Sequence, residues 1–115
     1  MFRGMYTDDE LNNKRFIISR ECDAINRRID RYMDKSQMFD LYEAIDGERN
    51  KLSEIVRPLP RDSAYWDQFV KAYNSADEAA LAISLAGSAT DDDRPGFLDQ
   101  TKNHLYQMSE YLVMW

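Results

Sequence analysis

The chain is poor in the residues that crosslink, bend or catalyse. Its 115 residues include one cysteine, one histidine, three prolines and four glycines. A single cysteine, Cys22, excludes an internal disulfide and a cluster of thiolate metal ligands within one chain. The scarcity of proline and glycine leaves room for long regular elements. No stretch approaches the roughly 18 apolar residues that a membrane-spanning helix needs.

The composition is that of one globular domain. Hydrophobic residues make up 43% of the chain and charged residues 31%, a balance that separates it from disordered sequences. A chain of this length buries roughly 65% of its unfolded surface, which is enough for a core without disulfide or metal support. The first six residues contain no apolar run of signal-peptide length. We therefore expect a single domain over residues 1–115, located in the cytoplasm.

The negative charge is unevenly distributed along the sequence. The net charge is -6. Residues 1–35 hold eight Lys and Arg against seven Asp and Glu, whereas the remainder holds seven against fourteen. Such an acidic remainder repels nucleic acid and attracts a basic protein surface.

The first long helix is predicted over 8–33. Thr7 and Glu10 have the spacing of a capping box, in which each side chain satisfies the backbone amide of the other residue. The apolar residues that follow recur at steps of three, four and seven, which places them on one side of a helix. These residues are Leu11, Ile18, Cys22, Ile25, Ile29 and Tyr32.

Three further helices are predicted before the long loop at 87–94. Apolar spacing predicts one over 36–56, and Pro58 and Pro60 then break the pattern. A short helix over 63–74 carries Trp66 and should supply much of the aromatic core. Ser75 with Glu78 forms a second capping-box pattern, which predicts a separate helix over 76–86. The last two segments could instead merge into one kinked helix.

The last helix, predicted over 95–114, has the most regular pattern in the chain. Its apolar positions alternate steps of three and four, as in the seam of a bundle or coiled coil. These positions are Leu98, Thr101, Leu105, Met108, Leu112 and Trp115. With no convincing strand, the sequence predicts an all-α fold: a compact four- to five-helix bundle.

Residues that could support catalysis or metal binding do not form a recognisable pattern. No Ser or Cys motif indicates a nucleophile that His104 could activate. Cys22 falls within an apolar stripe, where we expect a buried, unreactive thiol. Asp40 and Glu43 share a helix face, but a di-metal bundle needs Glu-x-x-His pairs from two helices. We therefore expect no cofactor, no metal and no enzymatic activity.

The leading functional hypothesis is protein binding. A small acidic helical protein can block a basic, nucleic-acid-handling protein by charge complementarity. Immunity proteins, antitoxins and phage anti-defence proteins are inhibitors of this type. The candidate contacts are acids in the second half of the chain, namely Asp77, Glu78, Asp91, Asp92, Asp93 and Asp99.

Two alternatives remain open from the sequence. In the first, the chain is a nucleic-acid-associated regulator that uses a basic face of the first helix, made of Arg20, Arg27, Arg28 and Arg31. In the second, it is an assembly subunit whose heptad seam over 98–115 pairs with another chain. The sequence leaves open whether the chain is a monomer or a homodimer, and it indicates no membrane attachment.

Overall fold

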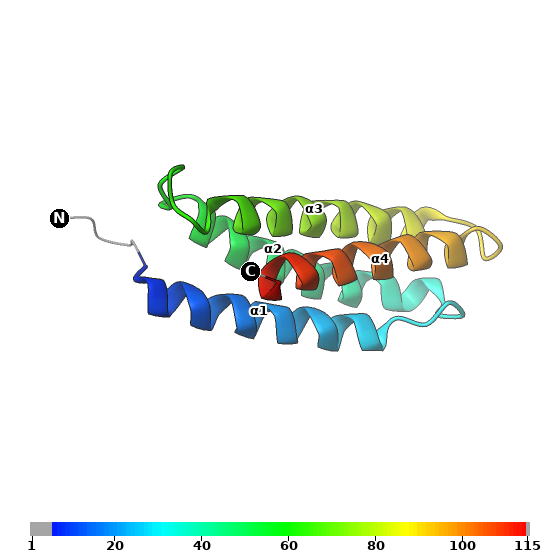
Figure 1. Ribbon diagram of the computed structural model, residues 1–115. Coiled ribbons are helices and arrows are strands. Elements are labelled where there is room, and N and C mark those ends of the chain that lie inside the picture. Colours follow the sequence, from blue (N-terminus) through cyan, green and yellow to red (C-terminus); the bar gives the residue numbers. More distant parts are fainter. Residues whose placement is uncertain (1–5, 115) are drawn as a thin grey trace.

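Four long helices make up most of the molecule. The structure, a computed structural model, describes residues 6–114, and this stretch contains no strand. Successive helices run in opposite directions along one long axis (Figure 1). The helices are α1 (Asp8–Arg28), α2 (Met38–Val56), α3 (Trp66–Ser88) and α4 (Arg94–Val113), and a 3-10 turn, η1 (Lys35–Gln37), leads into α2. The predicted all-α bundle is confirmed.

The start of α1 follows the predicted capping box. The backbone amide of Glu10 donates to Thr7 Oγ1 at 3.2 Å, and the amide of Thr7 donates to Glu10 Oε1 at 3.0 Å. These bonds satisfy two of the amides that a helix N-terminus leaves unpaired.

The end of α1 comes earlier than predicted. The helix stops at Arg28 instead of continuing to residue 33, and Ile29 takes an extended conformation. Lys102 of α4 stabilises this end, because its Nζ donates to the carbonyls of Asn26 and Ile29 at 3.0 and 3.2 Å. Ile29 is still buried, but Tyr32 is 86% exposed and is not part of the core.

The third helix corrects the prediction of two short ones. Residues 66–88 form one continuous helix, and the segment over 63–65 precedes it. Ser75, predicted to cap a new helix, lies buried in the middle of α3. Small buried residues continue on both sides of Ser75, so the helix continues there as well. The free energy gained by burying this stripe outweighs the local capping signal. Phe69 is fully buried, whereas Trp66 is only half-buried and is not the central aromatic residue.

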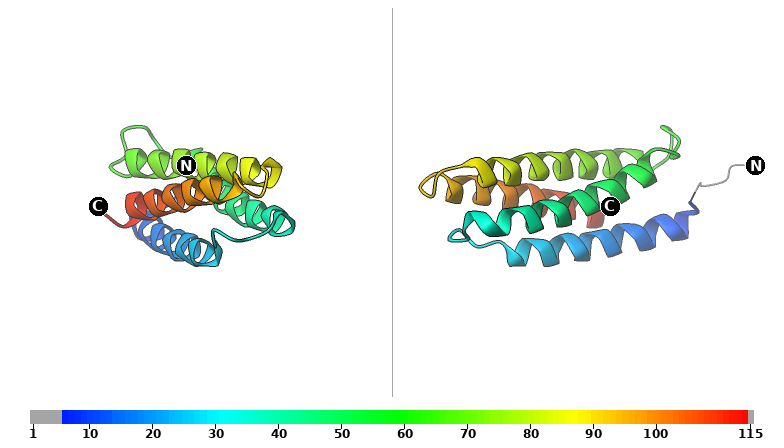
Figure 2. Two further views of the ribbon diagram at one scale, coloured as in Figure 1. Left: turned by 90° about the vertical axis from the view of Figure 1, so that its right-hand side faces the viewer. Right: turned by 180° about the vertical axis from the view of Figure 1, so that it is seen from behind.

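The four helices are not equally close. Among the helix pairs whose backbones lie close together, contact is densest between α3 and α4 and sparsest between α1 and α2. The view from behind in Figure 2 shows α1 and α2 diverging as they leave their connecting loop, while α2 approaches α3. The small side chains of α3 allow close approach of its neighbours. The buried ones are Ala72, Ser75, Ala76, Ala79, Ala80, Ala82 and Ala86.

A row of polar contacts joins α1 to α4. Side chains one turn apart on α1 meet groups one turn apart on α4, running in the opposite direction. We call this row the polar ladder. Its contacts are Arg15 Nη1 to the Leu112 carbonyl at 2.9 Å, Ser19 Oγ with Ser109 Oγ at 2.7 Å, Cys22 Sγ to the Leu105 carbonyl at 3.1 Å and Asn26 Nδ2 to the Lys102 carbonyl at 3.1 Å.

The predicted seam of α4 lies in the core of the single chain. Its five described positions, Leu98, Thr101, Leu105, Met108 and Leu112, are all fully buried. Trp115, the sixth, lies outside the described residues. Among the described helices, none combines the length and apolar character needed to cross a membrane.

Candidate interaction surface

The net negative charge lies on α2, α3 and the turn that follows α3. Helix α2 carries five carboxylates against two cations, and α3 carries three against one. The turn over 89–93 adds three more carboxylates. In contrast, α1 is neutral, with five acids and five bases, and α4 is neutral, with two acids and two bases. The bundle therefore has an acidic α2–α3 side and a neutral α1–α4 side.

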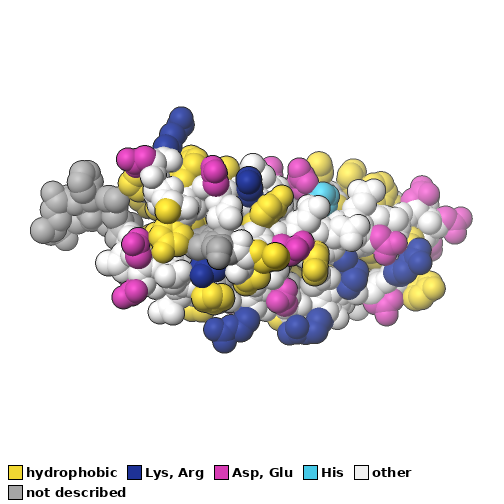
Figure 3. Space-filling model, viewed as in Figure 1, with side chains coloured by type: hydrophobic (Ala, Val, Ile, Leu, Met, Phe, Trp, Pro, Cys, Tyr) yellow, Lys and Arg dark blue, Asp and Glu magenta, His cyan; other side chains and the backbone are white. Residues whose placement is uncertain are grey.

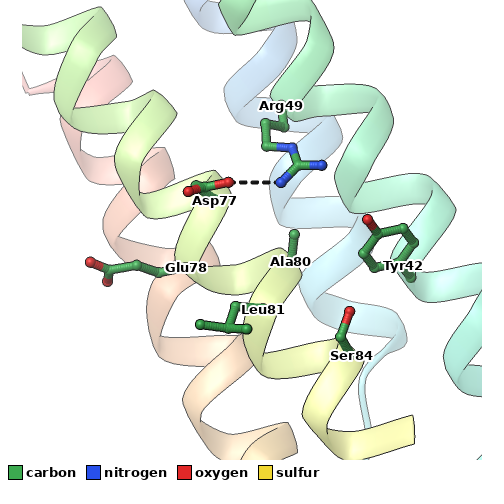
Figure 4. A pocket seen from close by; sticks show the side chains of 7 residues that line it. All are labelled: Tyr42, Arg49, Asp77, Glu78, Ala80, Leu81 and Ser84. Atoms are coloured by element: carbon green, nitrogen blue, oxygen red, sulfur yellow. Dashed lines mark hydrogen bonds and ion pairs between the residues drawn. The ribbon is translucent and has the colours of Figure 1, made fainter.

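Two adjoining hollows follow the line between α2 and α3, with volumes of about 300 and 390 Å³. Both are lined by Tyr42 and Ser84, so they meet at these side chains, and we call the two hollows together the α2–α3 groove. Figure 4 shows the end of the groove nearer the middle of the bundle. The complete lining is Lys35, Met38, Phe39, Tyr42, Arg49, Asp77, Glu78, Ala80, Leu81, Ile83, Ser84 and Gly87.

Arg49 joins the two helices at this end of the groove. Its Nη1 donates to Asp77 Oδ1 of α3 at 2.7 Å, and its Nη2 donates to Asp46 one turn earlier on α2. Figure 4 shows the guanidinium reaching from α2 toward α3, with Tyr42 beside it. The arginine is only 24% exposed at its side chain, whereas Asp77 is 59% exposed. One guanidinium therefore neutralises much of the charge of two carboxylates.

Large apolar side chains remain exposed around the groove. Phe39, at the start of α2, is 68% exposed, and Leu81, on α3, is 61% exposed. Leu85 follows Leu81 one turn along and is 42% exposed. Exposed apolar groups of this size gather at interaction sites when they border a hollow. Neither Phe39 nor Leu81 was predicted as a functional residue.

The structure does not bring the six predicted contact acids together. Asp77 and Glu78 lie on α3, and Asp91, Asp92 and Asp93 lie in the turn at one end of the molecule. Twelve residues of mostly helical chain, 79–90, separate the two groups, which corresponds to about 20 Å between Glu78 and Asp91 along a helix. In Figure 3 carboxylates gather over the α3–α4 turn, at the end away from the grey residues. The predicted contact acids therefore lie in separate regions of the surface, and their role in binding stays a prediction.

Several of these acids already have partners within the chain. Asp77 pairs with Arg49, and Asp99 lies 3.6 Å from Nε of Arg31. Glu78 Oε2 lies 3.0 Å from Nδ1 of His104, an ion pair when the imidazole is protonated, although the two groups are not oriented as a hydrogen bond.

The turn between α3 and α4 is organised by Arg94, which is almost fully buried. Its guanidinium donates to the carbonyls of Ala86 and Ala89 at 3.2 and 3.1 Å, and to Asp91 Oδ1 at 2.7 Å. Arginine satisfies carbonyl groups that the end of a helix leaves unpaired. Asp92 and Asp93 are exposed, and the described part of the chain gives them no ion pair.

The predicted basic face is only partly present. Arg20, Arg27 and Arg28 are exposed on α1, and Lys and Arg side chains are visible along its edge in Figure 3. Arg31 is also exposed, but it lies beyond the end of the helix and pairs with Asp99. Helix α1 also carries as many acids as bases, so carboxylates are interspersed among these arginines.

The space between α1 and α2 contains a buried carboxyl group. Glu48 is 5% exposed; its Oε2 accepts from Lys51 Nζ at 3.1 Å, and its buried Oε1 has no hydrogen-bond partner. Lys51 also donates to Glu21 of α1 at 2.9 Å, so one ammonium serves two carboxylates. Burial raises the pKa of Glu48 to about 7. Burial likewise raises the pKa of the Cys22 thiol to about 12, which suits a packed rather than a nucleophilic cysteine.

Residues that could hold a metal do not converge within the described residues, which contain no group of three or more His, Cys, Asp or Glu side chains suited to an ion. The α2–α3 groove combines apolar and charged groups from two helices. Sequence reasoning named Asp77 and Glu78 as candidate partner contacts but did not name Phe39, Arg49 and Leu81. The helical spacing of Phe39, Tyr42 and Arg49 offered a signal that they share one side of α2.

Comparison with protein-family models, with curated proteins and with solved structures gave no match for this chain. The functional argument is therefore made from the surface itself.

Proposed function

We propose that this chain functions by binding another protein that carries a basic surface. The observation that supports this most strongly is the separation of charge. All of the excess negative charge of the helices belongs to α2 and α3, the same two helices that border the groove and its exposed apolar side chains. Charge complementarity of this kind accelerates association and selects partners of opposite charge.

In its most specific form the proposal is an inhibitor of a basic, nucleic-acid-handling protein. A positively charged nucleic-acid channel is the protein surface that an acidic helical module complements best. Immunity proteins, antitoxins and phage anti-defence proteins act in this way. The contact surface we propose consists of the α2–α3 side, including Asp77 and Glu78, and extends to Asp91, Asp92 and Asp93 at the adjacent turn. Asp99 belongs to α4 and pairs with Arg31, so we leave it outside this surface.

Affinity capture with charge-matched variants tests this proposal. The test variant removes three exposed carboxylates from the α2–α3 side: Asp40→Asn, Glu43→Gln and Asp67→Asn. The control variant removes three from the α1–α4 side: Asp9→Asn, Asp23→Asn and Glu110→Gln. Both variants change the net charge equally, so a difference between them reports position rather than total charge. A third variant, Asp92→Asn with Asp93→Asn, tests the turn.

We expect wild type and the control variant to capture the same basic protein at low salt, and the test variant to lose it. The captured protein should then be inhibited in its nucleic-acid activity when the wild-type chain is added. The proposal is wrong if no basic protein is captured, or if the test and control variants behave alike.

A nucleic-acid-associated regulator is the second candidate. The exposure of Arg20 and Arg27 on the same side of α1 favours it, and it predicts an affinity for DNA or RNA that falls with salt. A gel-shift measurement at low salt, with Arg20→Gln and Arg27→Gln as the variant, separates it from the first proposal. The assembly alternative is less well supported, because pairing through the seam over 98–115 would require buried residues of α4 to leave the core.

A further inference from the structure

The α2–α3 groove has the length of a short helix. Along α3 its lining runs from Asp77 to Gly87, which is about 15 Å or three helical turns. The lining is partly small and apolar, since Ala80 and Gly87 contribute to it together with the larger Met38 and Ile83. Small residues along a groove allow a third helix to approach two others closely.

The backbone around the groove favours a helical rather than an extended occupant. Both banks are α-helices, whose amide and carbonyl groups bond within the same helix, so the groove offers no strand edge. An extended peptide would therefore gain no main-chain hydrogen bonds from α2 or α3. A bound helix satisfies its own backbone and contributes only side chains, which is the usual mode of helix-in-groove recognition.

The rims of the groove determine the character of the occupant. Each rim carries an exposed apolar side chain, Phe39 on α2 and Leu81 on α3. Each bank also carries an acid nearby: Glu43 lies one turn after Phe39 on α2, and Glu78 lies one turn before Leu81 on α3. The lining also holds two cations: Arg49 pairs with Asp46 and Asp77, and Lys35 lies in η1 at the other end of the groove. An apolar strip flanked by carboxylates matches a helix with an apolar face flanked by Lys or Arg, as in the paired charges beside a coiled-coil seam.

A second copy of this chain does not fit the same description. It would bring another α2–α3 side with the same excess of carboxylates against the first, and like charges across an interface oppose association. The occupant that satisfies both the shape and the charge of the groove is therefore supplied by a different protein.

We propose that the α2–α3 groove binds an amphipathic basic helix of about three turns from a partner protein. This inference rests on the proposed function, because it takes the partner to be a protein with a basic surface. It adds the secondary structure of the partner segment and the residues that receive it. The apolar face of the bound helix lies over Phe39 and Leu81, and its flanking cations reach Glu43 and Glu78.

A displayed library of helical peptides tests this inference with a defined probe. Peptides of about 18 randomised residues, long enough to include three turns and both ends, are selected on the immobilised wild-type chain. We expect the enriched sequences to be basic, with apolar residues at helical spacing. One enriched peptide is then titrated against wild type, the groove variant Phe39→Gln with Leu81→Gln, and the control Tyr106→Gln. Tyr106 is 60% exposed on α4, outside the groove, and so matches the groove residues in exposure.

The groove variant should weaken binding by about tenfold or more, whereas the control should stay within about twofold of wild type. Glu43→Gln with Glu78→Gln should reduce the salt dependence of binding. Circular dichroism of the bound peptide should show helix. The inference is overturned if no peptide is enriched, if the enriched peptides are acidic or extended, or if the groove variant binds as well as wild type.

The two proposals fail in different ways. If no basic helical peptide binds the groove, but the wild-type chain and the control variant capture a basic protein that the test variant loses, the helical occupant is wrong and the proposed function stands. Groove-dependent binding of a basic helical peptide, with no captured protein, would overturn the proposed function instead.

Discussion

The two long sides of the bundle use their polar residues in opposite ways. On the α1–α4 side a row of polar side chains of α1 bonds to Ser109 and to backbone carbonyls of α4 along the polar ladder, and both helices are neutral. On the α2–α3 side Arg49 makes the bridging ion pair, and the excess carboxylates point outward beside exposed apolar side chains. This comparison is the basis of our proposal that a partner binds the α2–α3 side rather than the α1–α4 side.

The largest expected effect comes from the core that supports the groove. Ile83 is fully buried on α3, so Ile83→Ala removes packed methyl groups and should lower the free energy of unfolding by about 2–5 kcal/mol. Urea denaturation at equilibrium measures this loss. Leu85→Ala, two residues away but 42% exposed, is the control and should cost much less. Equal losses in the two variants would mean that the α2–α3 side is not packed as described.

Glu48 sharpens the comparison, because it is the one buried acid on α2. Its folded-state pKa of about 7 exceeds the ordinary value of 4.5. The fold therefore favours the protonated carboxyl, and stability falls as the pH rises through about 7. Glu48→Gln removes this loss and should stabilise the protein by about 2 kcal/mol at about pH 8, with little effect at about pH 5.

Thermal unfolding of wild type and Glu48→Gln across this pH range measures the difference. Glu54→Gln, an exposed acid on the same helix, is the matched control and should show no such trend. If the difference in stability between Glu48→Gln and wild type were the same at both ends of this pH range, the buried, partly unpaired state of Glu48 would be contradicted.

A smaller effect is expected from cutting the polar ladder. Ser19→Ala removes one partner of the 2.7 Å bond to Ser109 and leaves the other buried hydroxyl without it, which should cost about 1 kcal/mol. The double variant with Ser109→Ala should cost less than the sum of the two single changes, because it removes both ends of the same bond. Strict additivity in this double-mutant cycle would show that the two serines are not coupled.

The smallest effect on stability is expected at the groove surface. Phe39→Gln and Leu81→Gln replace exposed side chains, so each should change the free energy of unfolding by no more than about 0.5 kcal/mol. The same denaturation measurement checks this. A large loss of unfolding free energy would mean that these side chains stabilise the fold, and would contradict the argument that they are available to a partner.

The sequence predicted the parts of this structure that depend on local pattern. The capping box at Thr7 and Glu10 and the buried positions of α4 follow from spacing alone, and both are confirmed. The break predicted at Ser75 is wrong, because a Ser-x-x-Glu pattern also occurs inside a helix when its serine is buried by neighbouring helices. The early end of α1 depends on Lys102, which lies far away in the sequence.

The candidate surface was less predictable for the same reason. Asp77 and Glu78 were identified as acids, but their pairing with Arg49 and His104 depends on how α3 aligns with α2 and α4. That alignment is decided by packing across the whole bundle, not by residues near in sequence. The apolar rim was missed because helical spacing does not tell which apolar side chains at the edge of a helix face stay exposed, as Phe39 and Leu81 do.

The salt dependence of partner binding tests the central claim most directly. The affinity of the captured basic protein is measured over a series of salt concentrations for wild type, for the α2–α3 test variant and for the α1–α4 control variant. We predict that affinity falls with salt, and that the test variant shows both weaker binding and a shallower slope, while the control variant follows wild type. An affinity independent of salt, or identical slopes for the test and control variants, would contradict the claim.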